Sequence, residues 1–150
     1  MYFVDRKKIN TTLSYMKSII PLLEKSPSLS SNAIGELALE RIAQNIIESI
    51  TDVGNSMIDG FIMRDPGSYE DIIDILTDEK VIPAEMEGPI KEVLALRKML
   101  VRDFVSVNHQ EVAKTLLVNI EALKQFPDKI EHYLTHELGP VSAFLPEDQA

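Results

Sequence analysis

The most constraining feature of this sequence is a long run of apolar residues at helical spacing between about Ala33 and Ile62. Apolar side chains recur there every three or four residues, a spacing that places them along one side of an α-helix. They are Ile34, Leu37, Ala38, Ile42, Ile46, Ile50, Val53, Met57 and Phe61. A helix of this length with an apolar side needs other helices to cover it, so the pattern predicts the central helix of a bundle. Gly54 inside it predicts close helix contact or a local kink, because glycine costs about 1 kcal/mol relative to alanine within a helix.

Capping residues and prolines divide the rest of the chain into further helices. Asp5, Ser68 and Asn108 are the predicted N-caps. We expect Pro21 to kink the first helix near its end and Pro127 to break or kink a later one. Residues 26–32 are rich in serine and are expected to form a loop.

These signals predict one all-α domain over residues 1–150, with about 140–150 as a flexible tail. Besides the long helix, the expected helices cover residues 5–23, 68–76, 89–105, 108–123 and 130–138, with the Gly139-Pro140 pair as the final stop. The sequence contains no pair of alternating apolar segments that would indicate strands. The expected architecture is an antiparallel helix bundle of five to six helices.

The net charge of −9 limits what the surface can bind, because Asp and Glu outnumber Lys and Arg by 24 to 15. Proteins that bind nucleic acid through its phosphates usually carry a basic surface. Any RNA contact must therefore use a local basic region, or a partner must bring the RNA. No apolar run approaches the roughly 20 residues that span a bilayer. The sequence has no cysteine, and together these features lead us to expect a cytoplasmic protein that does not enter the membrane.

Few residue patterns indicate a metal, a cofactor or a nucleophile. The sequence has no glycine-rich phosphate loop, no zinc-spaced Cys/His set and no nucleophile elbow. His132 and His136 lie four residues apart beside Glu137, but no third ligand is evident, and we interpret them as surface residues. We expect no metal and no cofactor.

A polar stripe follows the long predicted helix. It consists of Glu40, Gln44, Glu48, Asp52 and Asn55. The Glu-x-x-His elements of di-iron bundles are missing. The stripe is therefore expected to be a solvated face, or a partly buried network that pairs with arginines.

Arg97 and Arg102 lie among apolar residues that favour partial burial of this segment. Buried arginines usually need partners. One interpretation is structural, with ion pairs to Asp52, Glu48 or Glu92. The other is a functional site. The residues alone favour the structural interpretation, because ion pairs are commoner than active sites.

The segment Leu94–Asn108 (LALRKMLVRDFVSVN) resembles the signature of HepT-like proteins in the HEPN superfamily, which reads Arg-Asn-x-x-x-His-x-Tyr. The blocks 38–44, 51–58 and 68–76 also resemble that family, and the likeness is greatest to its YutE-like branch. The resemblance implies an all-α homodimer and a metal-independent RNase with sites between the subunits. It also implies, as partner, an MNT nucleotidyltransferase antitoxin that adenylylates the motif tyrosine.

The chain departs from this signature at the positions that carry the chemistry. Arg97 keeps the arginine, but Lys98 replaces asparagine, Arg102 replaces histidine and Phe104 replaces tyrosine. Arginine cannot act as a general base at neutral pH, and phenylalanine has no hydroxyl to modify. We expect a degenerate ribonuclease motif, in a dimer that binds RNA or nucleotide phosphate through Arg97, Lys98 and Arg102, without cleavage or with weak activity.

Two alternatives stay open. Arg102 and His109 satisfy a looser form of the motif, in which Arg102 binds phosphate and His109 is the acid/base of an active endoribonuclease. Taken together, the signature and its looser form make Arg97, Arg102 and His109 the candidate catalytic residues. The second alternative is a protein interaction module that binds a nucleotidyltransferase-type partner.

Overall fold

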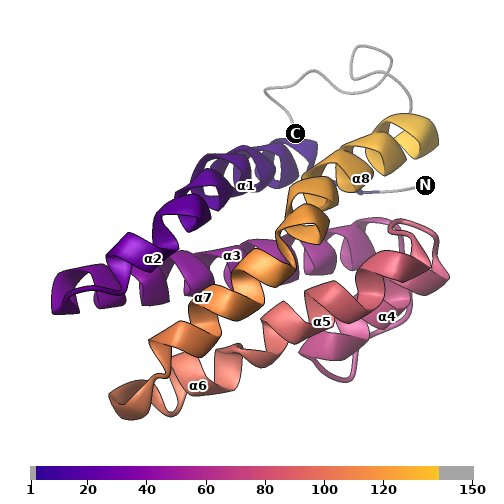
Figure 1. Ribbon diagram of the computed structural model, residues 1–150. Helices are drawn as coiled ribbons and strands as arrows, with labels where there is room; N and C mark the ends of the chain where they lie inside the picture. Colours follow the sequence, from indigo (N-terminus) through magenta and orange to yellow (C-terminus); the bar gives the residue numbers. More distant parts are fainter. Residues whose placement is uncertain (1–2, 139–150) are drawn as a thin grey trace.

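The computed structural model of the protein describes residues 3–138 (Figure 1), and every regular element in that range is helical. The α-helices are α1 (Arg6–Ile19), α2 (Ser26–Leu29), α3 (Ala33–Gly60), α4 (Tyr69–Asp78), α5 (Glu87–Ala95), α6 (Arg97–Val101), α7 (His109–Val118) and α8 (Ile120–Leu138). Three 3₁₀ helices join them: η1 (Ile20–Lys25), η2 (Ala84–Met86) and η3 (Phe104–Ser106). The predicted all-α class is confirmed. Without α2 and α6, which have four and five residues, six longer α-helices remain.

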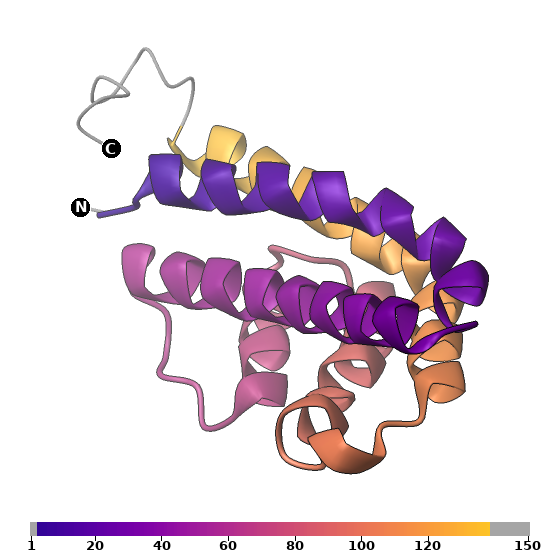
Figure 2. The same ribbon diagram turned by 90° about the vertical axis from the view of Figure 1, so that its left-hand side faces the viewer.

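Helix α3 runs through the middle of the molecule, as its apolar stripe predicts. Figures 1 and 2 show α1 and α8 side by side on one side of it, with α4, α5 and α6 on the other. Helix α7 also packs against α3 and continues into α8. None of the helices in residues 3–138 is both long enough and apolar enough to cross a bilayer.

The predicted N-caps are confirmed, because each side chain accepts a hydrogen bond from a free backbone N–H of its helix. Asp5 accepts from Lys8 N at 3.0 Å, Ser68 Oγ from Asp71 N at 3.1 Å, and Asn108 from Glu111 N at 3.1 Å. Local side-chain chemistry thus sets where these helices begin.

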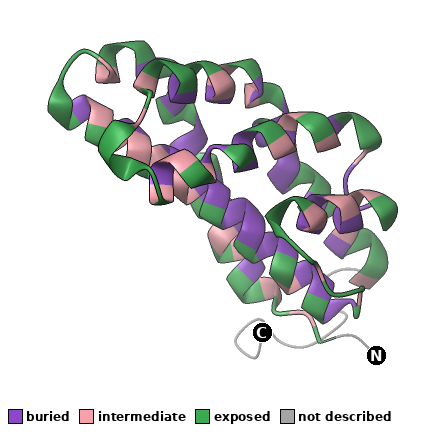
Figure 3. Cartoon of the chain, turned by 90° about the horizontal axis from the view of Figure 1, so that it is seen from below, coloured by how far each residue is buried: buried purple, intermediate pink, exposed green. Residues whose placement is uncertain are grey.

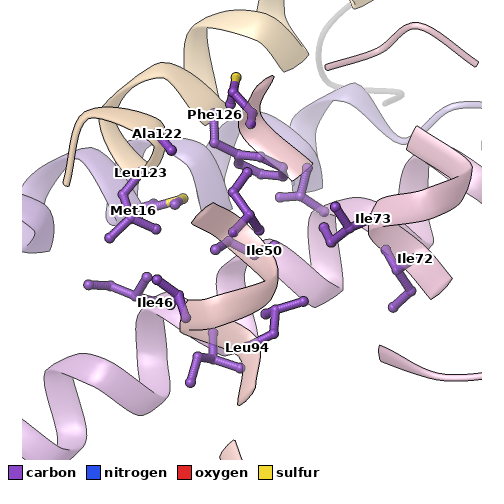
Figure 4. Close-up of a cluster of buried hydrophobic side chains, with 14 of the residues drawn as sticks. Met16, Ile46, Ile50, Ile72, Ile73, Leu94, Ala122, Leu123 and Phe126 are labelled. Atoms are coloured by element: carbon purple, nitrogen blue, oxygen red, sulfur yellow. The ribbon is translucent and has the colours of Figure 1, made fainter. Parts of the chain in front are cut away.

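The core lies on both sides of α3. Its labelled members in Figure 4 come from α1, α3, α4, α5 and α8, and they are Met16, Ile46, Ile50, Ile72, Ile73, Leu94, Ala122, Leu123 and Phe126. Figure 3 shows the buried residues on the sides of the helices that face one another. Gly54 is buried where α3 meets α4, and a Cβ there would collide with Cγ2 of Ile72. The predicted close contact at Gly54 is confirmed.

Two large members of the predicted apolar stripe are exposed to solvent. Ile34 is 82% exposed and Leu37 is 64% exposed. At 3.6 residues per turn, both lie on the side of α3 opposite the buried Leu39 and Ala43. The side of α3 that faces the core therefore begins later in the helix than the spacing predicts.

Pro21 and Pro127 do not affect their helices in the same way. Helix α1 ends at Ile19, and Pro21 lies near the start of η1, so the chain tightens into a 3₁₀ helix there. Pro127 is buried inside the continuous α8, so the expected break is wrong. The predicted helix 108–123 ends instead at Val118, before the buried Asn119.

Two further boundaries differ from the prediction. The expected helix 89–105 is divided into α5, α6 and η3, and the expected loop 26–32 contains α2. The predicted tail at 140–150 and the stop at Gly139-Pro140 lie outside the described residues.

Candidate functional site

The four candidate residues lie along the segment from α6 to the start of α7. Arg97 and Lys98 are the first two residues of α6, and Arg102 is its C-cap. His109 is the first residue of α7, after η3. Helix α6 packs against α3, which places the start of this segment beside the central helix.

Arg97 has an aromatic neighbour in place of a carboxylate. Its guanidinium carbon lies 4.3 Å from the centroid of the Tyr69 ring, at the first turn of α4. The Nε atom is buried without a hydrogen-bond partner. A buried N–H of a charged group that lacks an acceptor costs folding free energy, so the packing of this arginine is not optimised for stability.

The structural interpretation of Arg97 is not supported by its surroundings. Within residues 3–138, no ion pair joins Arg97 to Glu48, Asp52 or Glu92. Glu48 and Asp52 are exposed, and Glu92 accepts a hydrogen bond from Asn119 Nδ2 at 3.1 Å. The guanidinium therefore keeps its positive charge unneutralised by the described part of the chain.

Lys98 and Arg102 are exposed, and neither forms an ion pair with any described residue. The backbone N–H of Arg102 donates to the carbonyl oxygen of Lys98 at 2.9 Å, which closes the last turn of α6. Both cationic side chains are thus free to contact a ligand in solution.

His109 has two carboxylate neighbours on α3. Its Nε2 lies 2.6 Å from Glu40 Oε2, and its Nδ1 lies 3.4 Å from Glu36 Oε2. The side chain is only 18% exposed. A carboxylate thus faces each ring nitrogen of His109, and the side chain is held against α3 by contacts within the chain.

The polar stripe of α3 divides into two parts. Glu48, Asp52 and Asn55 are exposed, which confirms the expected solvated face for them. Glu40 is partly buried, but its partner is His109, so the expected pairing with an arginine is wrong for this residue. Sequence reasoning did not identify Glu36 as a member of this cluster, although its spacing of four residues from Glu40 would place both on one helix face.

The turn that carries Tyr69 is held by a second arginine. Arg64 donates two hydrogen bonds to the Asp71 carboxylate, at 2.8 and 2.9 Å, and the Gly67 N–H donates a third at 2.8 Å. The hydrogen bond from Arg64, followed by that from Gly67, lowers the pKa of Asp71 to about 2. The turn before α4 is therefore fixed by polar contacts on both sides of Tyr69.

A shallow cavity of about 540 Å³ lies between α5, α6 and α7. Three carboxylates line it, from Glu92, Asp103 and Glu111, against the single cation of Lys98. Because this lining is acidic, the cavity is unsuited to a phosphate. The candidate anion site is on Arg97 and not in this cavity.

No group of three or more His, Cys, Asp or Glu side chains that could hold a metal ion occurs in the described residues. His132 and His136 are exposed, with ring centroids 6.1 Å apart.

Comparisons with known proteins agree with the motif resemblance. Residues 9–130 match the family model described as Ribonuclease HepT-like. YutE of Bacillus subtilis (strain 168), which is named as a candidate RNase, is 49% identical over 144 residues, covering 96% of this chain and 99% of that protein.

Solved structures show the same relationship. A structure of Bacillus subtilis YutE, described as a cytosolic protein of unknown function, has a TM-score of 0.91 and 49% identity, over 96% of this chain and all of that one (100%). A tri-AMPylated Shewanella oneidensis HEPN toxin in complex with an MNT antitoxin has a TM-score of 0.73 at 19% identity, over 83% of this chain and 96% of that chain. The second likeness shows a shared fold alone. The match over residues 9–130 and the close similarity to YutE show that the chain belongs to the Ribonuclease HepT-like family.

Proposed function

We propose that this protein is a non-cleaving HepT-like homodimer that binds the phosphates of RNA or nucleotides through Arg97, with Lys98 and Arg102 as additional cations. The observation that carries this proposal is the state of Arg97, whose charge no carboxylate of the described residues neutralises. A phosphate is a matching ligand, because guanidinium N–H groups bind its oxygens in a planar, two-pronged geometry.

The surroundings of the motif support binding without cleavage. Transfer of the RNA 2′-hydroxyl proton needs a base, and Arg102 at the motif position cannot supply one. His109 is enclosed by Glu36 and Glu40, which disfavours the alternative active site of Arg102 and His109. Phe104, 64% exposed, provides no hydroxyl for adenylylation at the motif position.

A homodimer is supported by apolar side chains on the surface. Ile34 and Leu37 are exposed at the start of α3, and Phe104 and Val105 are 64% and 88% exposed in η3. The contact between His109 and Glu40 joins the segment after η3 to the first turns of α3. A second copy of the chain that covers this region would bury apolar surface now in water.

A nucleotidyltransferase-type antitoxin is a further candidate partner, because two solved structures of similar fold are described as toxin–antitoxin structures. We place the protein in the cytoplasm, as the relative described as cytosolic suggests. Sedimentation of the wild type and of Val105→Asp tests the dimer. A wild-type monomer at micromolar concentration would contradict it.

Incubation of the purified protein with a mixed RNA pool tests the function, with binding and cleavage measured together. We expect binding without cleavage, and a loss of affinity in Arg97→Ala but not in Lys129→Ala, an exposed lysine on α8. Cleavage that both His109→Ala and Arg102→Ala abolish would establish the alternative ribonuclease instead. Absence of any RNA binding would overturn the phosphate site.

A further inference from the structure

Tyr69 has a surface position that the packing of the core does not explain. It is the first residue of α4, 41% of it is exposed, and its ring lies against Arg97. The ring is thus held at the surface beside the cation proposed to bind phosphate. A large part of its area reaches solvent.

The position of Tyr69 is fixed by its neighbours in the chain. Ser68 caps α4 immediately before it, and Asp71, two residues after it, is tied to Arg64 and Gly67. An aromatic side chain on such a turn loses little freedom when a ligand arrives, which favours binding.

Arginine and tyrosine side by side recognise two different parts of a nucleotide. The N–H groups of a guanidinium bind phosphate oxygens, and flat aromatic or guanidinium surfaces stack on bases. Stacking needs a base that is not paired in a duplex.

We propose that Tyr69 and Arg97 together form a nucleotide platform, in which Arg97 binds a phosphate and Tyr69 provides aromatic surface for the adjacent base. The ligand class is then single-stranded RNA, with double-stranded RNA excluded. This inference rests on the proposed phosphate site at Arg97. It goes further by assigning a specificity-determining role to a residue outside the motif.

A purely structural role for Tyr69 makes a different prediction. If the ring only holds Arg97 in place, its loss weakens every phosphate ligand to the same extent. If the ring contacts the base, its loss weakens ligands that carry bases more than ligands that lack them.

The test compares a short oligoadenylate with an abasic ribose-phosphate oligomer of the same length, so that both carry the same charge. Affinities are measured for the wild type, Tyr69→Leu and Tyr69→Phe, with thermal melting to show that each variant is folded. The wild type should bind the oligoadenylate about tenfold more tightly than the abasic oligomer, the size expected for one stacked base. Tyr69→Leu should lose this preference, because it should lose more affinity for the oligoadenylate than for the abasic oligomer, and Tyr69→Phe should retain it.

The outcomes separate the two proposals. A wild type that binds both oligomers equally, or a Tyr69→Leu variant weakened equally for both, overturns the platform but leaves the phosphate site at Arg97 intact. A wild type that binds neither oligomer overturns the phosphate site as well. Binding of duplex RNA as tight as that of the oligoadenylate also overturns the platform.

Discussion

The turn between α3 and α4 and the segment around α6 each contain an arginine, and the two side chains have opposite surroundings. Arg64 donates two hydrogen bonds to Asp71 and also lies 3.8 Å from Asp78. Arg97 lies on the ring of Tyr69, with a buried Nε that has no acceptor. In a chain with a net charge of −9, carboxylates are available to pair an arginine where stability requires it. Arg97, which has no ion pair within the described residues, is therefore the better candidate for ligand binding.

The largest expected effect is that of Arg97→Ala on RNA binding. Hydrogen bonds to charged groups contribute about 1.5–3 kcal/mol, so affinity for single-stranded RNA should fall by about tenfold or more. The free energy of unfolding should change by less than about 1 kcal/mol, because the cation–π contact is the main interaction lost. Fluorescence anisotropy and urea unfolding measure the two quantities. A large loss of stability with unchanged affinity would assign Arg97 the same structural role as Arg64.

His109→Ala should affect stability and not binding. The variant loses the contact with Glu40 and leaves two carboxylates close together on α3, so the free energy of unfolding should fall by about 1–2 kcal/mol. His132→Ala on the exposed face of α8 is the matched control and should leave stability unchanged. Urea unfolding compares them. Equal stability of the two variants would show that the His109 cluster contributes nothing.

The smallest effect is expected from Asp71 in acid. Its pKa is lowered to about 2, so its ionised form stabilises the folded state above the ordinary aspartate pKa of about 4. That contribution should disappear as the pH falls from about 4 through about 2. The difference in unfolding free energy between wild type and Asp71→Asn should therefore shrink over this range. A difference that stays constant would show that the pair with Arg64 does not hold the turn.

Local signals predicted much of the fold. The capping roles of Asp5, Ser68 and Asn108 depend on residues three positions away, so the sequence contains everything needed to predict them. The central position of α3 could be predicted as well, because its apolar stripe is a periodicity within the helix itself. The predicted break at Pro127 is wrong, because the helix continues through this buried proline despite its local tendency to end a helix.

The candidate site was only partly predictable. The motif resemblance identified Arg97, Lys98, Arg102 and the absence of a base at Arg102. The partners of these residues come from distant parts of the chain: Tyr69 for Arg97, and Glu36 and Glu40 for His109. Such contacts depend on how α3, α4, α6 and α7 pack, and they cannot be predicted from residue spacings within one helix.

The most direct test of the central claim is the salt dependence of single-stranded RNA binding by the wild type and Arg97→Ala. Each phosphate contact in a single strand contributes a slope of about 0.7 to the fall of log affinity with log salt concentration. We predict a measurable slope for the wild type and a smaller one for Arg97→Ala. Equal slopes for the two proteins, or no binding by the wild type, would contradict a phosphate site at Arg97.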